Sequence, residues 1–187
     1  MKERVAVFGG SFDPPHLGHA LACFWALESG QVDRVLLIPA ALHAFGKQYT
    51  ARFDQRMAMC RLAVQRLADA VSVSDIEGRR PGVSYMVDTL RALEQEMPAS
   101  TFRLLVGTDV AQEVHKWRES EEVLRRAPLL ELPRPLPGQR FDERPGALPP
   151  ISSTQVRDAL KSGHGVEHLL AATVTAYIRS HGLYEVR

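Results

Sequence analysis

The sequence has few cysteines, no long apolar run and almost no net charge, and each shortage excludes a class of protein. Its two cysteines, Cys23 and Cys60, lie far apart with no Cys-x-x-Cys spacing, so they provide neither a zinc ligand set nor a disulfide framework. A formal net charge of +1 gives no support to a general nucleic-acid or membrane-surface role. No apolar run reaches the roughly 18 residues that a spanning helix needs. We therefore expect neither nucleic acid nor membrane as a partner.

Size and composition favour one globular domain over residues 1–187. Hydrophobic content of 45% and charged content of 24% are ordinary for a soluble protein. The chain is long enough for one substantial core and short for two. A first strand that starts at Arg4 or Val5 leaves no space for a signal peptide, which favours a reduced, cytoplasmic enzyme. The sequence does not decide whether the chain forms a homo-oligomer, because helix faces and interface faces look alike in a sequence.

Short apolar runs alternate with amphipathic stretches along most of the chain. Strands are predicted at Val5–Phe8, Arg34–Pro39, Ala70–Ser74, Phe102–Val106 and Leu129–Leu132. Helices are predicted over residues 18–29, 53–68, 84–96, 119–126, 154–162 and 167–181. Residues 133–150 hold six of the twelve prolines and no apolar periodicity, which predicts a surface loop before a C-terminal helical segment, 154–187.

This alternation predicts the α/β class: a Rossmann-like, doubly wound parallel sheet with helices on both faces, in a single domain. Right-handed crossovers follow almost by default. In such sheets ligands bind beyond the carboxyl ends of the strands, near the switch in strand order. Gly9 follows the first strand, the loop up to Lys47 follows the second, and Gly107 follows the fourth. The residues at these positions are therefore expected to meet at one edge of the sheet.

The most informative stretch is Gly9–His19, which reads Gly-Gly-Ser-Phe-Asp-Pro-Pro-His-Leu-Gly-His directly after the first strand. Its glycines let backbone N–H groups approach an anion closely. The start of the following helix adds N–H donors and the positive end of the helix dipole. His16 and His19 can donate hydrogen bonds to phosphate oxygens and, when protonated, offset charge that develops there. The stretch indicates a polyphosphate site, although two histidines that merely cap a helix would be the plainer interpretation.

Four segments, in order along nearly the whole chain, resemble one group of enzymes. The stretch Gly9–His19 is similar to the His/Thr-x-Gly-His signature of a nucleotidyltransferase superfamily. Residues 151–157, Ile-Ser-Ser-Thr-Gln-Val-Arg, are similar to its C-terminal Ile-Ser-Ser-Thr-x-x-Arg signature. Arg80–Leu90, and Gly107–Asp109 with Trp117, resemble the segments that hold the mononucleotide and ATP in bacterial nicotinate-nucleotide adenylyltransferases. The chain therefore looks like a member of that family.

The resemblance implies adenylyl transfer from ATP to nicotinate mononucleotide, or to nicotinamide mononucleotide, with release of pyrophosphate in NAD biosynthesis. Mg²⁺ would accompany ATP, held mainly by phosphates and waters, with no residue as a direct metal ligand. A protein can promote such a transfer by positioning and electrostatics alone. Two rival functions stay open. One is adenylyl transfer to another phosphorylated acceptor such as phosphopantetheine, and the other is a non-catalytic nucleotide-binding sensor on the same fold.

The resemblance also implies roles for individual residues. The implied catalytic residues are His16, His19, Lys47 and Arg157. The implied ATP-binding residues are Gly9, Gly10, Ser11, Phe12, His16, His19, Gly107, Asp109, Ile151, Ser152, Ser153, Thr154 and Arg157. The implied mononucleotide-binding residues are His43, Ser84, Tyr85 and Trp117.

Several of these assignments compete with plainer structural roles. Residues 152–154 could serve only as a helix cap, whereas Arg157, one turn later, would point back toward an anion held at the helix start. Trp117 and Tyr85 could be core aromatics rather than a platform for a pyridine ring. Asp13 is expected to order its loop rather than to transfer protons.

The loop after the second strand departs from the family pattern. Where the family commonly carries Pro-Pro-His-Lys, this chain reads Ala-Leu-His-Ala-Phe-Gly-Lys over residues 41–47. His43 and Lys47 could supply equivalent positive charge, but a solvated lysine is the plainer expectation. The preference between the acid and amide mononucleotides also stays open, because it turns on one or two hydrogen bonds.

Overall fold

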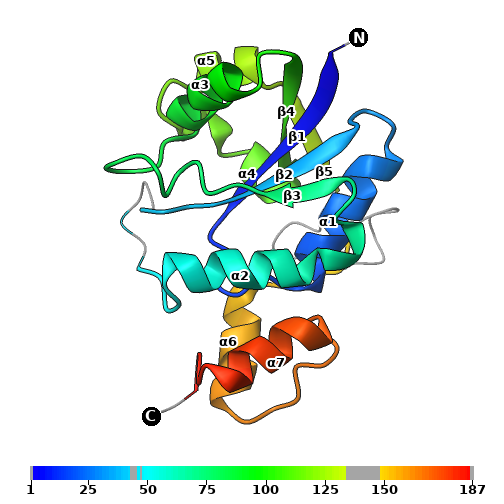
Figure 1. Cartoon of the computed structure of the whole chain (residues 1–187), viewed down its shortest axis with the longest axis vertical. Helices are drawn as coiled ribbons and strands as arrows, with labels where there is room; N and C mark the ends of the chain where they lie inside the picture. Colours follow the sequence, from blue (N-terminus) through cyan, green and yellow to red (C-terminus); the bar gives the residue numbers. More distant parts are fainter. Residues whose placement is uncertain (1, 43–45, 47, 134–147, 186–187) are drawn as a thin grey trace.

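In a computed structural model of the chain, which describes residues 2–42, 46, 48–133 and 148–185, five parallel strands form one sheet in the order β3-β2-β1-β4-β5 (Figure 1). The strands are β1 (Glu3–Gly10), β2 (Arg34–Pro39), β3 (Val71–Val73), β4 (Ser100–Gly107) and β5 (Leu129–Leu132). The helices are α1 (Leu17–Glu28), α2 (Phe53–Ala63), α3 (Met86–Glu96), α4 (Thr108–Ala111), α5 (Ser120–Arg126), α6 (Ser153–Lys161) and α7 (Ala172–Ser180). Short 3₁₀ turns lie at Gln65–Leu67 and Val114–Lys116.

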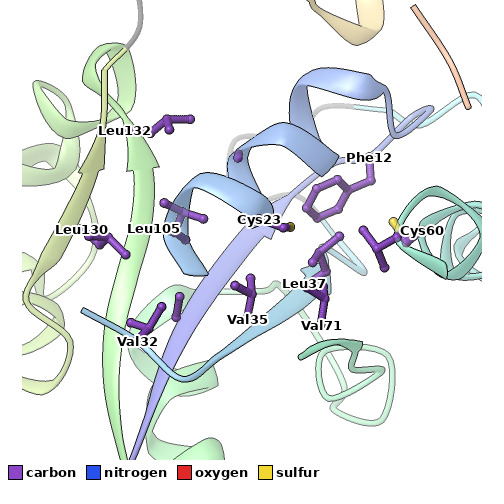
Figure 2. Packing of buried hydrophobic residues seen from close by; sticks show 14 residues of the cluster. Phe12, Cys23, Val32, Val35, Leu37, Cys60, Val71, Leu105, Leu130 and Leu132 are labelled. Atoms are coloured by element: carbon purple, nitrogen blue, oxygen red, sulfur yellow. The ribbon is translucent and has the colours of Figure 1, made fainter. Parts of the chain in front are cut away.

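Alternate residues of the central strands are buried on opposite faces of the sheet. Ala6 and Leu37 pack in one cluster with Cys23 of α1 and Cys60 of α2 (Figure 2). Val7, next to Ala6, packs in a second cluster with residues of α3 and α5. Successive side chains of a strand point to opposite faces, so strands covered on both sides must be apolar throughout. The structure therefore has the predicted doubly wound α/β class, with α1 and α2 on one face and α3 and α5 on the other (Figure 1).

The strand order reverses direction beside β1. The chain first builds outward from β1 through β2 to β3, and then crosses back so that β4 pairs with the other side of β1. The crevice at the carboxyl ends of two such strands is the usual ligand site in open parallel sheets. Gly10 ends β1 and Gly107 ends β4, so both lie at that crevice.

The C-terminal helices pack against α2 and not against the sheet (Figure 1). Val156 of α6 and Ile178 of α7 are buried in one cluster with Met59 of α2. The backbone N–H of Leu17, the first residue of α1, donates a hydrogen bond of 2.8 Å to the carbonyl oxygen of Leu169. The C-terminal segment therefore contacts the start of α1, where the histidine stretch lies.

Most predicted elements are confirmed, and the differences lie at their ends. The helix predicted over residues 167–181 is wrong in its first part, because it begins only at Ala172. Residues 167–169 form a turn whose Leu169 carbonyl bonds to α1, and Leu169 and Leu170 are buried in the C-terminal cluster. The helix predicted over residues 53–68 ends at Ala63 and continues as a 3₁₀ turn. Of the predicted loop at 133–150, only residues 133 and 148–150 are described.

Among the described residues, no helix is both long and apolar enough to cross a membrane.

Candidate active site

Two cavities open at the carboxyl edge of the sheet and share part of their walls. The first, of about 460 Å³, contains Tyr85 and is called the tyrosine pocket. The second, of about 300 Å³, contains His16 and His19 and is called the histidine pocket. Both pockets are lined by Gly9, Gly10, Ser11, Met86 and Trp117. The loop after β1 therefore lies where ligands in the two pockets would meet.

The two histidines line the histidine pocket at the start of α1. His16 is the N-cap residue of this helix and is buried. Its ring stacks on that of His19, with 3.7 Å between ring centroids. The backbone N–H of His16 donates a hydrogen bond of 3.1 Å to Nδ1 of His19. Because Nδ1 accepts, a neutral His19 ring carries its proton on Nε2, which makes Nε2 a hydrogen-bond donor.

Two neighbours fix where these rings lie. A Cβ atom at Gly18 would lie only 3.0 Å from Nδ1 of His16, so a side chain there would have to displace the His16 ring by a few tenths of an ångström. Phe12 packs edge-on against His19, with 4.8 Å between ring centroids. Phe12 is 1% exposed and has a φ of 48°, a conformation that is costly for a bulky side chain. Its side chain lies in the core and lines neither pocket, so its contact with His19 positions that ring.

The Asp13 carboxylate joins three segments that are distant in sequence. It accepts hydrogen bonds from the backbone N–H groups of Thr50, at 2.7 Å, and Ala51, at 3.0 Å. It also accepts a bond of 2.7 Å from the Tyr184 hydroxyl. Burial and the hydrogen bond to Asp13 raise the pKa of Tyr184. The prediction that Asp13 orders its loop is confirmed.

The start of α6 holds the same loop from its other side. Arg157 donates a hydrogen bond of 2.7 Å from Nη1 to the carbonyl oxygen of Asp13 and one of 3.1 Å from Nη2 to Thr154 Oγ1. The Ser153 hydroxyl donates to the carbonyl oxygen of Pro14 at 2.8 Å. The second signature is thereby brought against the loop that carries the histidines. Arg157 is half-buried and is not among the residues that line the two pockets.

The remaining residues of the second signature divide between capping and lining. Ser152 is the N-cap of α6, and its hydroxyl accepts a hydrogen bond of 3.2 Å from the backbone N–H of Gln155. The capping role is therefore confirmed for Ser152, while a phosphate contact stays a prediction. Ile151, one residue earlier, lines the histidine pocket.

The buried residue Arg56 was missed by sequence reasoning. Its guanidinium donates to the carbonyl oxygens of Ser11 and Ala40, both at 2.8 Å, and of Ala51, at 3.3 Å. It also lies 3.9 Å from the centre of the Tyr49 ring, and burial lowers the pKa of Arg56. The loops after β1 and β2 are thus tied to one cation. The available signal was an arginine on the apolar face of a predicted helix, four residues before Cys60.

The tyrosine pocket is built from the start of α3 and the turn before α5. The Ser84 backbone N–H donates a hydrogen bond of 2.9 Å to the carbonyl oxygen of Leu42, which attaches the loop after β2 to this wall. The guanidinium of Arg118 lies 4.7 Å from the centre of the Tyr85 ring. Helix α3 begins at Met86, and the first N–H groups of a helix lack intrahelical acceptors. The pocket therefore combines aromatic rings, rim cations and a helix start.

A buried carboxylate, that of Glu77, also belongs to this pocket and was missed. Glu77 lies in the turn after β3, a position where no pattern in the sequence indicates burial.

Some of the other predicted site residues line a pocket and others do not. Gly107 lines the histidine pocket, whereas Asp109 is exposed in the first turn of α4 and lines neither pocket. Trp117 is half-buried and lines both pockets while also packing against the α3–α5 core, so both of its predicted roles fit its place. His43 and Lys47 lie outside the described residues.

A wider hollow of about 750 Å³ lies at the opposite, amino-terminal edge of β1 and β4. Its arginines are engaged by neighbouring groups. Arg4 pairs with Asp33, and Arg126 pairs with Glu94. Arg103 donates from Nη2 to the carbonyl oxygen of Leu129. The residues of both signatures lie away from this hollow, so the carboxyl edge is the candidate active site.

Among the described residues, no three or more His, Cys, Asp or Glu side chains gather as a metal-binding group.

Comparisons with known proteins show the family of the chain. Residues 7–159 match the family described as cytidylyltransferase-like. A protein of Anaeromyxobacter dehalogenans named as a probable nicotinate-nucleotide adenylyltransferase is 38% identical, over 97% of this chain and 97% of its own. A protein of Thermus thermophilus with the same name is 39% identical, over 97% of this chain and 99% of its own. The chain belongs to the nicotinate-nucleotide adenylyltransferase family.

The fold of this family member matches that of a solved relative. The nicotinic acid mononucleotide adenylyltransferase of Plasmodium falciparum, complexed with NaAD, superposes with a TM-score of 0.76 at 17% identity. The match covers 97% of each chain. At this identity the match supports the fold alone, and it confirms the predicted α/β architecture. The resemblance inferred from the four motifs is confirmed by the family match.

Proposed function

We propose that this chain transfers the adenylyl group of ATP to nicotinate mononucleotide, forming the dinucleotide and pyrophosphate in NAD biosynthesis. The observation that carries this proposal is the pair of pockets that meet at Gly9–Ser11. One pocket offers imidazoles at a helix start, and the other offers aromatic walls. The named relatives that are 38% and 39% identical over nearly their whole length support the same reaction.

The histidine pocket suits ATP. Its phosphates would lie at the start of α1, against the backbone of Gly9 and Gly10, where N–H groups and the helix dipole favour negative charge. An oxygen of the acceptor phosphate attacks the α-phosphorus, and the bond from that phosphorus to the bridging oxygen breaks as pyrophosphate leaves. A hydrogen bond from Nε2 of His19 would stabilise the charge that develops in this transfer. His16, Gly107 and Ile151 would complete the pocket.

The tyrosine pocket suits the pyridine mononucleotide. The pyridine ring would pack on Trp117 and Tyr85, with its carboxylate near the first N–H groups of α3. Lys116 and Arg118 at the rim would attract the anionic substrate. Its phosphate would lie toward Gly9–Ser11. No general base is needed, because a phosphate monoester with a second pKa of about 6 is largely dianionic at pH 7.

Arg157 and the loop that holds Lys47 complete the proposed machinery. Arg157 uses two donors on Asp13 and Thr154, and a guanidinium has five. We infer that it both holds the histidine loop and contributes positive charge to the ATP phosphates, with residues 152–154 beside it. His43 and Lys47 stay proposed contacts of the mononucleotide and of the reacting phosphates.

Magnesium would enter with ATP. This ion usually binds through substrate phosphates and keeps several waters, so it does not need a cage of protein ligands. We infer that Asp109, an exposed carboxylate two residues beyond Gly107, contacts either a ribose hydroxyl of ATP or such a hydrated ion through water. The single domain over residues 1–187 stays a prediction, as does a cytoplasmic location. The prediction also allows a homo-oligomer.

The test is pyrophosphate release from ATP and Mg²⁺ with three acceptors in parallel: nicotinate mononucleotide, nicotinamide mononucleotide and phosphopantetheine. We expect release with the nicotinate form, at a rate higher than with the amide, and none with phosphopantetheine. Release with phosphopantetheine alone would establish the first rival function. Binding of ATP without release for any acceptor would establish the sensor.

A further inference from the structure

A buried negative charge forms part of the wall of the tyrosine pocket. The side chain of Glu77 belongs to a residue that is only 4% exposed, yet it lines this pocket with Tyr85 and Trp117. Among the described residues, its Oε2 atom is buried and has no hydrogen-bond partner. Most buried polar atoms are hydrogen-bonded, and a buried charge without a partner is costly. Because Oε2 is closed off from solvent, its charge would act on a ligand in the pocket through the wall and not by a direct hydrogen bond.

A hydrogen-bond network holds this carboxylate in place. Oε1 of Glu77 accepts a bond of 2.9 Å from the Thr89 hydroxyl, and Thr89 in turn accepts one of 3.1 Å from Nη2 of Arg80. The Thr89 oxygen also lies 3.2 Å from the carbonyl oxygen of Tyr85. The carboxylate is thereby fixed relative to the backbone of Tyr85, whose ring forms another wall of the pocket.

Of the described charged residues that line the pocket, Glu77 is the buried one. Arg80 reaches it through Thr89 and does not line the pocket, and its Nη1 is likewise buried with no hydrogen-bond partner among the described residues. Lys116 and Arg118 line the pocket at exposed positions, where Lys116 pairs with Glu113 at 3.2 Å. Charges in bulk water are strongly screened, whereas a charge behind a protein wall acts over several ångströms. The inner wall therefore carries the Glu77 charge, whereas each rim cation is offset by a neighbouring carboxylate, since Arg118 lies 3.7 Å from Glu119.

We propose that Glu77 makes the pocket specific for a positively charged pyridinium ring. This inference rests on the proposed function, in which a pyridine mononucleotide occupies the pocket. The ring nitrogen of such a nucleotide is bonded to ribose and carries a fixed positive charge. The Glu77 carboxylate attracts that charge, and the faces of Trp117 and Tyr85 add cation–π attraction.

The experiment compares nicotinate mononucleotide with its dihydro form, which differs by one added hydride and has a neutral ring. The ratio of kcat/KM for the two acceptors is measured in wild type, Glu77→Gln and Glu77→Asp. Wild type and Glu77→Asp are expected to prefer the charged ring. In Glu77→Gln the ratio of kcat/KM for the charged over the neutral acceptor is expected to fall about tenfold, because the amide keeps the shape of the side chain and removes its charge. Glu121→Gln, at an exposed glutamate outside both pockets, is the control and should keep the ratio.

Each outcome decides the proposal. An equal loss for both acceptors in Glu77→Gln would mean that the carboxylate binds ribose or supports the fold, and would overturn it. If Glu77→Gln fails to fold, a wild type without preference for the charged ring would overturn it as well. Absence of pyrophosphate release from wild type with both acceptors would contradict the proposed function itself.

Discussion

The hydroxyl of Tyr184 donates a hydrogen bond of 2.7 Å to the carboxylate of Asp13, across 171 positions of the chain. Both side chains are buried. Burial raises the pKa of Tyr184, and the bond to Asp13 raises it further, so the phenol remains protonated and able to donate. Because Asp13 lies in the loop that leads to His16, the end of the chain stabilises the start of the active site.

Removal of this donor should destabilise the protein. Tyr184→Phe leaves the ring but takes one hydrogen bond from a buried carboxylate, at a cost of about 1–3 kcal/mol. The measurement is the free energy of unfolding in urea. Tyr177→Phe, on the half-buried Tyr177 of α7, is the control and should cost much less. Equal stability of Tyr184→Phe and wild type would show that this bond contributes nothing.

Arg56 should be more important to stability than any exposed arginine of α2. Arg56→Met fills similar space but leaves three backbone carbonyls without their donor, each at about 1–3 kcal/mol if it stays buried. We expect an unfolding free energy several kcal/mol lower and, because Ser11 lies in the shared wall, a lower turnover. Arg61→Met, on an exposed arginine of the same helix, should leave both nearly unchanged. A stable, active Arg56→Met protein would contradict this role.

Acid should weaken one specific surface contact. The side-chain and backbone hydrogen bonds from Arg4 hold the pKa of Asp33 at about 2, below its unfolded value of about 4. The stabilisation from this pair is therefore complete above about pH 4 and is lost as pH falls toward about 2. Asp33→Asn should be less stable than wild type at pH 6, with the difference shrinking toward pH 2. Asp69→Asn, at an exposed aspartate, is the control. A difference that does not change with pH would exclude the ion pair as its cause.

Substitutions in the two pockets should change the KM values of different substrates. Tyr85 lines only the tyrosine pocket, and Ile151 lines only the histidine pocket. Tyr85→Leu should raise the KM for the mononucleotide about tenfold with little change for ATP, and Ile151→Ala should do the reverse more weakly. Steady-state titration of each substrate measures this. Opposite assignments would mean that the substrates occupy the pockets in the other order.

The architecture could be predicted because the strands carry their own signal. Strands buried on both faces must be apolar at consecutive positions, as Arg34–Pro39 largely is, and such runs separated by helical patterns leave few topologies. The rule that ligands bind at the carboxyl edge then predicts one site for Gly9 and Gly107 from the sequence alone.

The interior of the site could not be predicted in the same way. The burial of Glu77 depends on how the turn after β3 packs against α3, which involves residues that are distant in sequence. The motif predicts an ATP contact for Phe12 but does not indicate that its backbone is left-handed or that its ring is buried edge-on against His19. The last helix begins at Ala172 and not at residue 167 for a similar reason. The carbonyl oxygen of Leu169 accepts a hydrogen bond from α1, and this tertiary contact outweighs the local helix propensity.

The most direct test of adenylyl transfer at this site follows the label of ATP marked at its α-phosphate, with Mg²⁺ and nicotinate mononucleotide. Wild type should move the label into the dinucleotide, and His19→Ala should do so about 10² times more slowly while it stays folded. His115→Ala, at an exposed histidine outside both pockets, should match wild type. Label that stays in ATP with wild type, or that moves equally fast with His19→Ala, would contradict the account.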